Sequence, residues 1–169
     1  AYDIASCLVG SEMCIRDSPN TVANSVRKIS NFNVALTTIH LNGGKDMIEA
    51  ASSEKGNIKI LGVSILTSLS ENDIFEITHT EFDAYFNNLI SIASNTNVDG
   101  VVCSPNELIK LKNFKKLKVV PGIRNDISDD DQKRVMSPME AYKKGADFIV
   151  VGRPITKSED PRKALELFL

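Results

Sequence analysis

Three loops that contain glycine directly follow apolar, β-rich stretches of the chain, and two of them also carry an arginine. The loops are Asn42-Gly43-Gly44, Pro121-Gly122-Ile123-Arg124 and Gly152-Arg153-Pro154. Glycine lets the backbone approach an anion closely, and an arginine can donate two parallel hydrogen bonds to a phosphate. The arginines therefore predict a site for a phosphorylated ligand. The competing interpretation is that each Gly-Arg pair forms only a turn.

Three other polar positions could take part in binding or catalysis. Thr67 follows the second β-rich stretch, where its hydroxyl could contact a ligand or, with Ser68, cap the next helix. His40 ends the first stretch and fits either acid–base chemistry or a structural hydrogen bond to a loop. Gln132 follows the acidic run 129–131, and the surrounding residues do not indicate a function for it.

The elements that must position these side chains alternate along the chain. Short, β-branched and almost continuously apolar stretches predict buried parallel strands at 34–39, 58–66, 98–103, 117–120 and 148–151. Apolar residues recur at helical spacing around Val26 and Phe86. Residues 104–107 and 137–140 share a Ser-Pro-x-Glu pattern that predicts helix starts, and Asp160-Pro161 opens a last helix.

A helix followed by five strand–helix units predicts an α/β protein with a parallel sheet. Two architectures fit this order, an open doubly wound sheet and a closed (β/α)8 barrel. A barrel needs eight units and typically about 250 residues. The number of units in this chain of 169 residues favours the open sheet on counting alone. Both architectures place ligands at the carboxyl ends of the strands, where the three glycine loops lie.

The composition is that of an ordinary globular domain, with 42% hydrophobic residues and a formal net charge of −2. The hydrophobic fraction excludes a disordered chain, and the small negative net charge argues against a nucleic-acid partner. The sequence also contains no apolar run of the ~18 residues that a membrane span needs. Cys7, Cys14 and Cys103 have no metal-ligand spacing. We therefore expect free thiols in a reducing, cytoplasmic compartment, no metal site, and Cys103 in the core.

Several short motifs follow one another in a fixed order after residue 18. They are Pro19-Asn20-Thr21-Val22-Ala23, His40 with Gly43-Gly44, Leu66-Thr67-Ser68-Leu69, Val102-Cys103-Ser104-Pro105, Pro121-Gly122-Ile123-Arg124, Asp131-Gln132-Lys133-Arg134 and Gly152-Arg153-Pro154-Ile155-Thr156. As a set, they resemble the orotidine 5′-phosphate decarboxylase family over residues 19–169. The resemblance implies a (β/α)8 barrel, here a partial barrel of about five βα units plus a leading helix, and it replaces the open sheet as the expected fold.

The resemblance also implies an activity. Members of this family are carboxy-lyases that convert orotidine 5′-phosphate to uridine 5′-monophosphate (UMP) and carbon dioxide in pyrimidine biosynthesis, without a cofactor. Carried over to this sequence, Arg153 and the Gly152 backbone would hold the 5′-phosphate, and Arg124 would belong to the same pocket.

Further substrate-binding roles follow from the same resemblance. Gln132 would lie over the phosphate and the pyrimidine edge, and Thr67 would contact the base. Thr21 would reach into the site of a partner subunit, because the family forms homodimers.

The segment before Pro19 departs from the family. The family pattern Asp-x-Lys-x-x-Asp meets Glu12, Cys14 and Asp17 here, so only the last position matches. In the family, the lysine stabilises the carbanion that forms when carbon dioxide leaves the substrate. The thiol of Cys14 cannot supply that positive charge. The first two strands have no counterpart either. The resemblance therefore assigns no catalytic residue and predicts a truncated decarboxylase that is inactive as written.

Residues 7–18 resemble the translation of a transposon-type sequencing adapter. We therefore predict that residues 1–18 are not native and that residues 19–169 form the partial barrel; a divergent natural segment is the alternative. Two other functions stay open. The missing lysine favours a non-catalytic, phosphate-binding partial barrel, and a related sugar-phosphate decarboxylase would share the fold.

Overall fold

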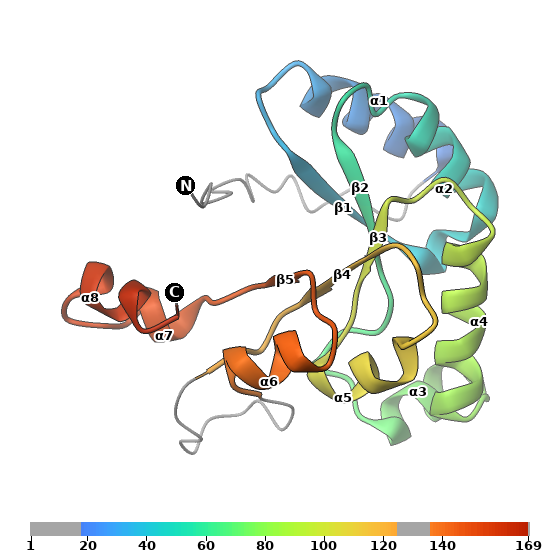
Figure 1. Ribbon diagram of the computed structural model, residues 1–169. Helices are drawn as coiled ribbons and strands as arrows, with labels where there is room; N and C mark the ends of the chain where they lie inside the picture. The colour runs from blue at the N-terminus through green and yellow to red at the C-terminus, as the bar shows by residue number, and fades with distance from the viewer. Residues whose placement is uncertain (1–17, 125–135, 169) are drawn as a thin grey trace. The chain divides into compact units, whose positions relative to one another are not determined.

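A computed structural model describes residues 18–124 and 136–168 (Figure 1). In the described chain, the strands form a sheet in the order β1-β2-β3-β4-β5. Their bounds are β1 Leu36–His40, β2 Lys59–Val63, β3 Gly100–Val102, β4 Leu117–Val120 and β5 Phe148–Ile149. A doubly wound sheet reverses its strand order at a switch point, whereas each strand here lies beside the next one in sequence. The fold is a partial α/β barrel, and the choice made by counting units was wrong.

Helices connect each strand to the next in the chain. Their bounds are α1 Pro19–Ser30, α2 Gly44–Ser53, α3 Glu71–Thr78, α4 Phe82–Ser94, α5 Pro105–Leu108, α6 Pro138–Lys143, α7 Arg153–Thr156 and α8 Pro161–Glu166, with 3-10 turns η2 Leu41–Gly43 and η3 Ile109–Leu111. Both Ser-Pro-x-Glu patterns start a helix as predicted. A helix was expected after each strand, but the residue ranges of α2 and α3 were not predicted.

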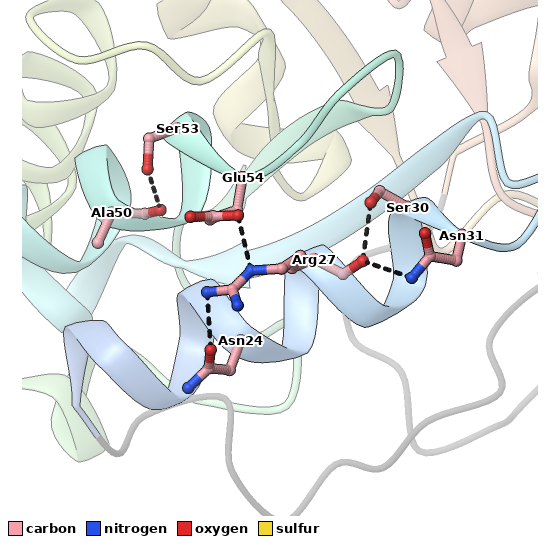
Figure 2. Close-up of polar contacts among 7 residues, drawn as sticks. All are labelled: Asn24, Arg27, Ser30, Asn31, Ala50, Ser53 and Glu54. Atoms are coloured by element: carbon pink, nitrogen blue, oxygen red, sulfur yellow. Dashed lines mark hydrogen bonds and ion pairs between the residues drawn. The ribbon is translucent and has the colours of Figure 1, made fainter.

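The described residues form two compact units. The first comprises residues 18–64 and 82–101, and its core includes Val26, Ile48 and Phe86. Helices α1 and α2 pack together there, and Arg27 Nε donates a hydrogen bond to Glu54 Oε2 at 2.8 Å, just beyond the end of α2 (Figure 2). The second Arg27 contact, from Nη2 to Asn24 Oδ1 at 2.8 Å, fixes the guanidinium on α1 (Figure 2).

The second unit comprises residues 65–81, 102–124 and 136–168. Its core contains Leu108, Leu111, Val120 and Ile123, all at most 2% exposed. Strands β4 and β5 pair in parallel within it, with Val120 opposite Ile149. This pairing determines where the loops after the two strands begin. The predicted boundary between residues 18 and 19 stays a prediction, because residues 1–17 lie outside the described chain.

Two aspartates hold the registers of β2/β3 and β4/β5 in the same way. Asp99 directly precedes β3; its amide donates to Ile60 O and its carboxylate accepts from Ile60 N, both at 2.8 Å. Asp147 directly precedes β5 and makes the same pair of bonds with Lys118, at 2.9 and 2.8 Å. A lysine ammonium adds to each carboxylate, from Lys55 at 2.7 Å and from Lys118 at 3.7 Å. We call these two arrangements the aspartate clamps.

Cys103 is 1% exposed at the end of β3, which confirms the prediction that it lies in the core. Burial, with a smaller effect of the nearby Glu107 carboxylate, raises the pKa of its thiol from 9.0 to about 12. Well below pH 9 the thiol is protonated whether the chain is folded or not, so it adds no pH dependence to stability there. As the pH rises from 9 through 12, the folded state loses stability, because only the unfolded chain ionises freely.

We therefore expect iodoacetamide to alkylate Cys103 of the folded chain at pH 8 about a thousandfold more slowly than in guanidinium chloride, since the thiolate is the nucleophile and its pKa is about three units higher. Site-resolved mass spectrometry after timed quenching measures both rates on the same chain. Equal labelling rates in the folded and unfolded chain would contradict a buried thiol.

Candidate functional site

The two arginines singled out by the sequence leave the same edge of the second unit. Val120 of β4 lies opposite Ile149 of β5, and Val150 N donates to Val120 O at 2.9 Å. Arg124 lies four residues beyond Val120, and Arg153 lies four residues beyond Ile149. Because the strands are parallel and Val120 is paired with Ile149, the two loops start at the same height along the strands. Each arginine then follows after the same number of residues.

The backbone after β4 is held in place before Arg124 begins. Gly122 has φ 77°, a conformation that favours glycine. Ile123 then forms a parallel bridge with Met136, and Arg124 N donates to Met136 O at 3.0 Å. Arg124 is half-buried. The start of its side chain is therefore fixed by a second strand-like contact, which the sequence did not reveal.

The backbone after β5 is open at Gly152. A Cβ built on Gly152 would meet no protein atom within 4 Å, and the residue is exposed. Its carbonyl accepts from Ile155 N at 2.9 Å and from Thr156 N at 3.0 Å, which starts α7 directly after the loop. Packing does not require glycine here, so the glycine leaves free space beside the half-buried Arg153.

Thr67 lies in the turn after β2 and belongs to the same unit as the arginines. The alternative that Thr67 and Ser68 cap the next helix is wrong. Helix α3 is capped by Ser70, whose Oγ accepts from Asp73 N at 3.2 Å while Asp73 Oδ2 accepts from Ser70 N at 2.7 Å. The Ser70–Asp73 spacing was the signal that could have placed this helix.

The other two predicted substrate-binding residues stand apart from this set. Gln132 lies outside the described residues. Thr21 belongs to the first unit, on α1, where its amide donates to the N-cap Ser18 Oγ at 3.3 Å. The structure therefore brings Thr67, Arg124, Gly152 and Arg153 into one unit and leaves Thr21 in the other.

The first glycine loop is also in the first unit. His40 ends β1 and is half-buried. Asn42 and Gly43 lie in η2, and Gly44, with φ 79°, starts α2. Tyr85 of α4 donates from its hydroxyl to Asn42 Oδ1 at 2.7 Å. The prediction that this loop follows a strand is confirmed, and α4 holds it from the side.

The described residues contain neither a metal-binding cluster nor a membrane-spanning helix. Within residues 18–124 and 136–168, His, Cys, Asp and Glu form no group of three or more that could hold a metal ion. No helix in the same ranges is both long enough and apolar enough to cross a membrane.

A model of the orotidine 5′-phosphate decarboxylase / HUMPS family matches residues 15–168. The chain belongs to this family. Among its relatives, the orotidine 5′-phosphate decarboxylases of Aquifex aeolicus and Ehrlichia chaffeensis are 44% and 41% identical; the matches cover 92% of this chain and 70% of each relative. A crystal structure of orotidine 5′-phosphate decarboxylase from Lactobacillus acidophilus superposes with a TM-score of 0.78 at 32% identity, over 90% of this chain and 70% of that one.

These comparisons confirm the resemblance, the barrel fold and the carboxy-lyase family. The chain spans about 70% of the length of these decarboxylases, in keeping with the expected partial barrel. The two alternative functions are not favoured, because the relatives are named as orotidine 5′-phosphate decarboxylases.

Proposed function

We propose that this chain supplies the phosphate-binding end of an orotidine 5′-phosphate decarboxylase site. The observation that carries the proposal is the register of β4 and β5, with Arg124 and Arg153 each four residues beyond a paired position. Two guanidinium groups that start from one edge of a sheet suit a dianion, because each can donate two parallel hydrogen bonds.

Within this proposal, Arg153 binds the 5′-phosphate and the open backbone at Gly152 shares the same anion. Arg124 belongs to the same pocket, and Thr67 contacts the pyrimidine. Gln132 covers the phosphate. The binding energy at this non-reacting end of the substrate helps to orient the carboxylate that leaves as carbon dioxide.

The remaining parts of the proposal concern assembly and location. Thr21 contributes to the site of a second copy in a homodimer. The ligand is orotidine 5′-phosphate or its product UMP, and the reaction uses no cofactor and no metal. The protein acts in the cytoplasm.

The test compares UMP with the nucleoside uridine, which lacks only the phosphate. We expect UMP to raise the midpoint of thermal unfolding of the chain in a concentration-dependent way, since a ligand that binds only the folded state stabilises it. Uridine at equal concentrations should have a much smaller effect. Equal shifts with UMP and uridine, or no shift with UMP, would overturn the phosphate assignment.

A further inference from the structure

A second cationic site lies in the second unit, at the opposite ends of the same two strands. A pocket of about 540 Å³ is lined by Ile109, Leu111, Lys112, Lys118, Lys143, Lys144 and Gly145. Lys118 is the second residue of β4, and Gly145 precedes the start of β5. The arginines of the proposed substrate site follow the carboxyl ends of these strands, so this lysine pocket is a separate place on the unit.

The lining of this pocket is unusually positive for a chain whose net charge is −2. Among the described residues, four lysines and no carboxylate line it. Two described acids interact with these lysines. Asp147 pairs with Lys118 at 3.7 Å, and Lys143 and Lys144 act on Glu140, whose pKa is lowered mainly by its hydrogen bonds with Ser137.

The size and walls of the pocket limit what it can hold. A volume of about 540 Å³ is within the range of small-molecule sites, roughly 300–1,000 Å³, and far exceeds one simple ion. Leu111, which is buried, and Ile109, which is half-exposed, supply an apolar part of the lining. The four lysines supply the charged part. Lysine ammonium groups act as compact point charges and do not impose the planar, two-donor geometry of an arginine guanidinium.

We propose that the lysine pocket binds a small anion that carries two or more linked phosphate groups. Several ammonium groups around one cavity match a ligand whose negative charges are close together and spread over more than one group. The surrounding lysines would raise the local concentration of such an anion and speed its association.

The test uses the full chain and sodium tripolyphosphate as the probe. Isothermal titration calorimetry measures its affinity, with sodium sulfate at the same ionic strength as the reference for non-specific screening. We expect the triple variant Lys112→Ala/Lys143→Ala/Lys144→Ala to bind tripolyphosphate at least about tenfold more weakly, since exposed ion pairs each contribute modestly and these act together. Lys118 is left unchanged because it belongs to an aspartate clamp.

A matched control removes the same charge elsewhere, in the exposed-lysine variant Lys28→Ala/Lys59→Ala/Lys163→Ala. This variant should keep the affinity within about twofold. Arg153→Ala is measured alongside it to detect any binding of tripolyphosphate at the proposed substrate site. Equal weakening in both triple variants would show a non-specific charge effect and overturn the proposal. Binding of tripolyphosphate no tighter than that of sulfate would overturn it too, and a loss confined to Arg153→Ala would move the anion to the substrate site.

A second readout needs no variant. Acetylation of lysines by an N-hydroxysuccinimide ester, resolved by mass spectrometry, should slow at Lys112, Lys143 and Lys144 when tripolyphosphate is present. Lys28, Lys59 and Lys163 should acetylate at unchanged rates. Uniform protection, or none at the pocket, contradicts the proposed site even if a variant folds poorly.

Discussion

The purified chain is expected to release no carbon dioxide from orotidine 5′-phosphate above the uncatalysed rate. Where the family pattern has a lysine, this sequence has Cys14, and Glu12 replaces the first aspartate. A thiol is neutral or negative and cannot stabilise a carbanion. Loss of one positioned transition-state charge costs on the order of 10³-fold in rate. Because the lysine and the first aspartate are both replaced here, we expect the combined loss to remove measurable catalysis.

Release of labelled carbon dioxide measures this directly, with the Aquifex aeolicus relative as the positive control. A chimera in which residues 1–18 are replaced by the whole part of that relative that precedes its match to Pro19, including its first two strands, should regain activity, because the proposed phosphate end is retained. Catalysis by the unaltered chain would contradict the prediction. An inactive chimera that still binds UMP would locate a further defect beyond residue 18.

Arg153→Ala should lower the affinity for UMP by about 10- to 100-fold, and Arg124→Ala by less. A hydrogen bond to a charged group contributes about 1.5–3 kcal/mol, and a bidentate arginine lies at the strong end. Arg153 is the more important of the two in this prediction, because the open backbone of Gly152 beside it can share the anion. Titration calorimetry with UMP and with uridine separates the phosphate contribution from that of the nucleoside.

The matched control is Arg162→Ala, which removes an exposed arginine from α8 and should leave both affinities unchanged. If Arg153→Ala binds UMP as tightly as the unaltered chain does, while uridine binds equally to both proteins, Arg153 does not hold the phosphate.

The predictable parts of the fold were those specified by local sequence. Ser104 and Ser137 start helices as expected, since serine, proline and glutamate each act within one turn. Helix α3 has a weak apolar pattern: Ile74 is its one buried residue, whereas Phe75 and Ile77 are more than half exposed. The start of α3 could be predicted from Ser70 and Asp73, but the apolar pattern of the segment gives little support for a helix.

The site shows the same limit in a different way. The sequence places Arg124 and Arg153 after neighbouring strands, and the structure confirms it. The loops that carry the two arginines start at the same height along β4 and β5 because Val120 pairs with Ile149, and this pairing is a non-local property. The lysine pocket was missed for a similar reason, because Lys112 follows η3, Lys118 lies in β4 and Lys143 lies in α6, and only the fold brings them together.

The aspartate clamps have a consequence for how such a chain can be recombined. The clamp of Asp99 with Lys55 and Ile60 is complete within the first unit, and that of Asp147 with Lys118 is complete within the second. Each pair of strands therefore carries its own alignment signal and needs none from the other pair. A crossover between β3 and β4 interrupts neither signal, so shuffling halves among homologous genes at this point preserves how each pair of strands aligns.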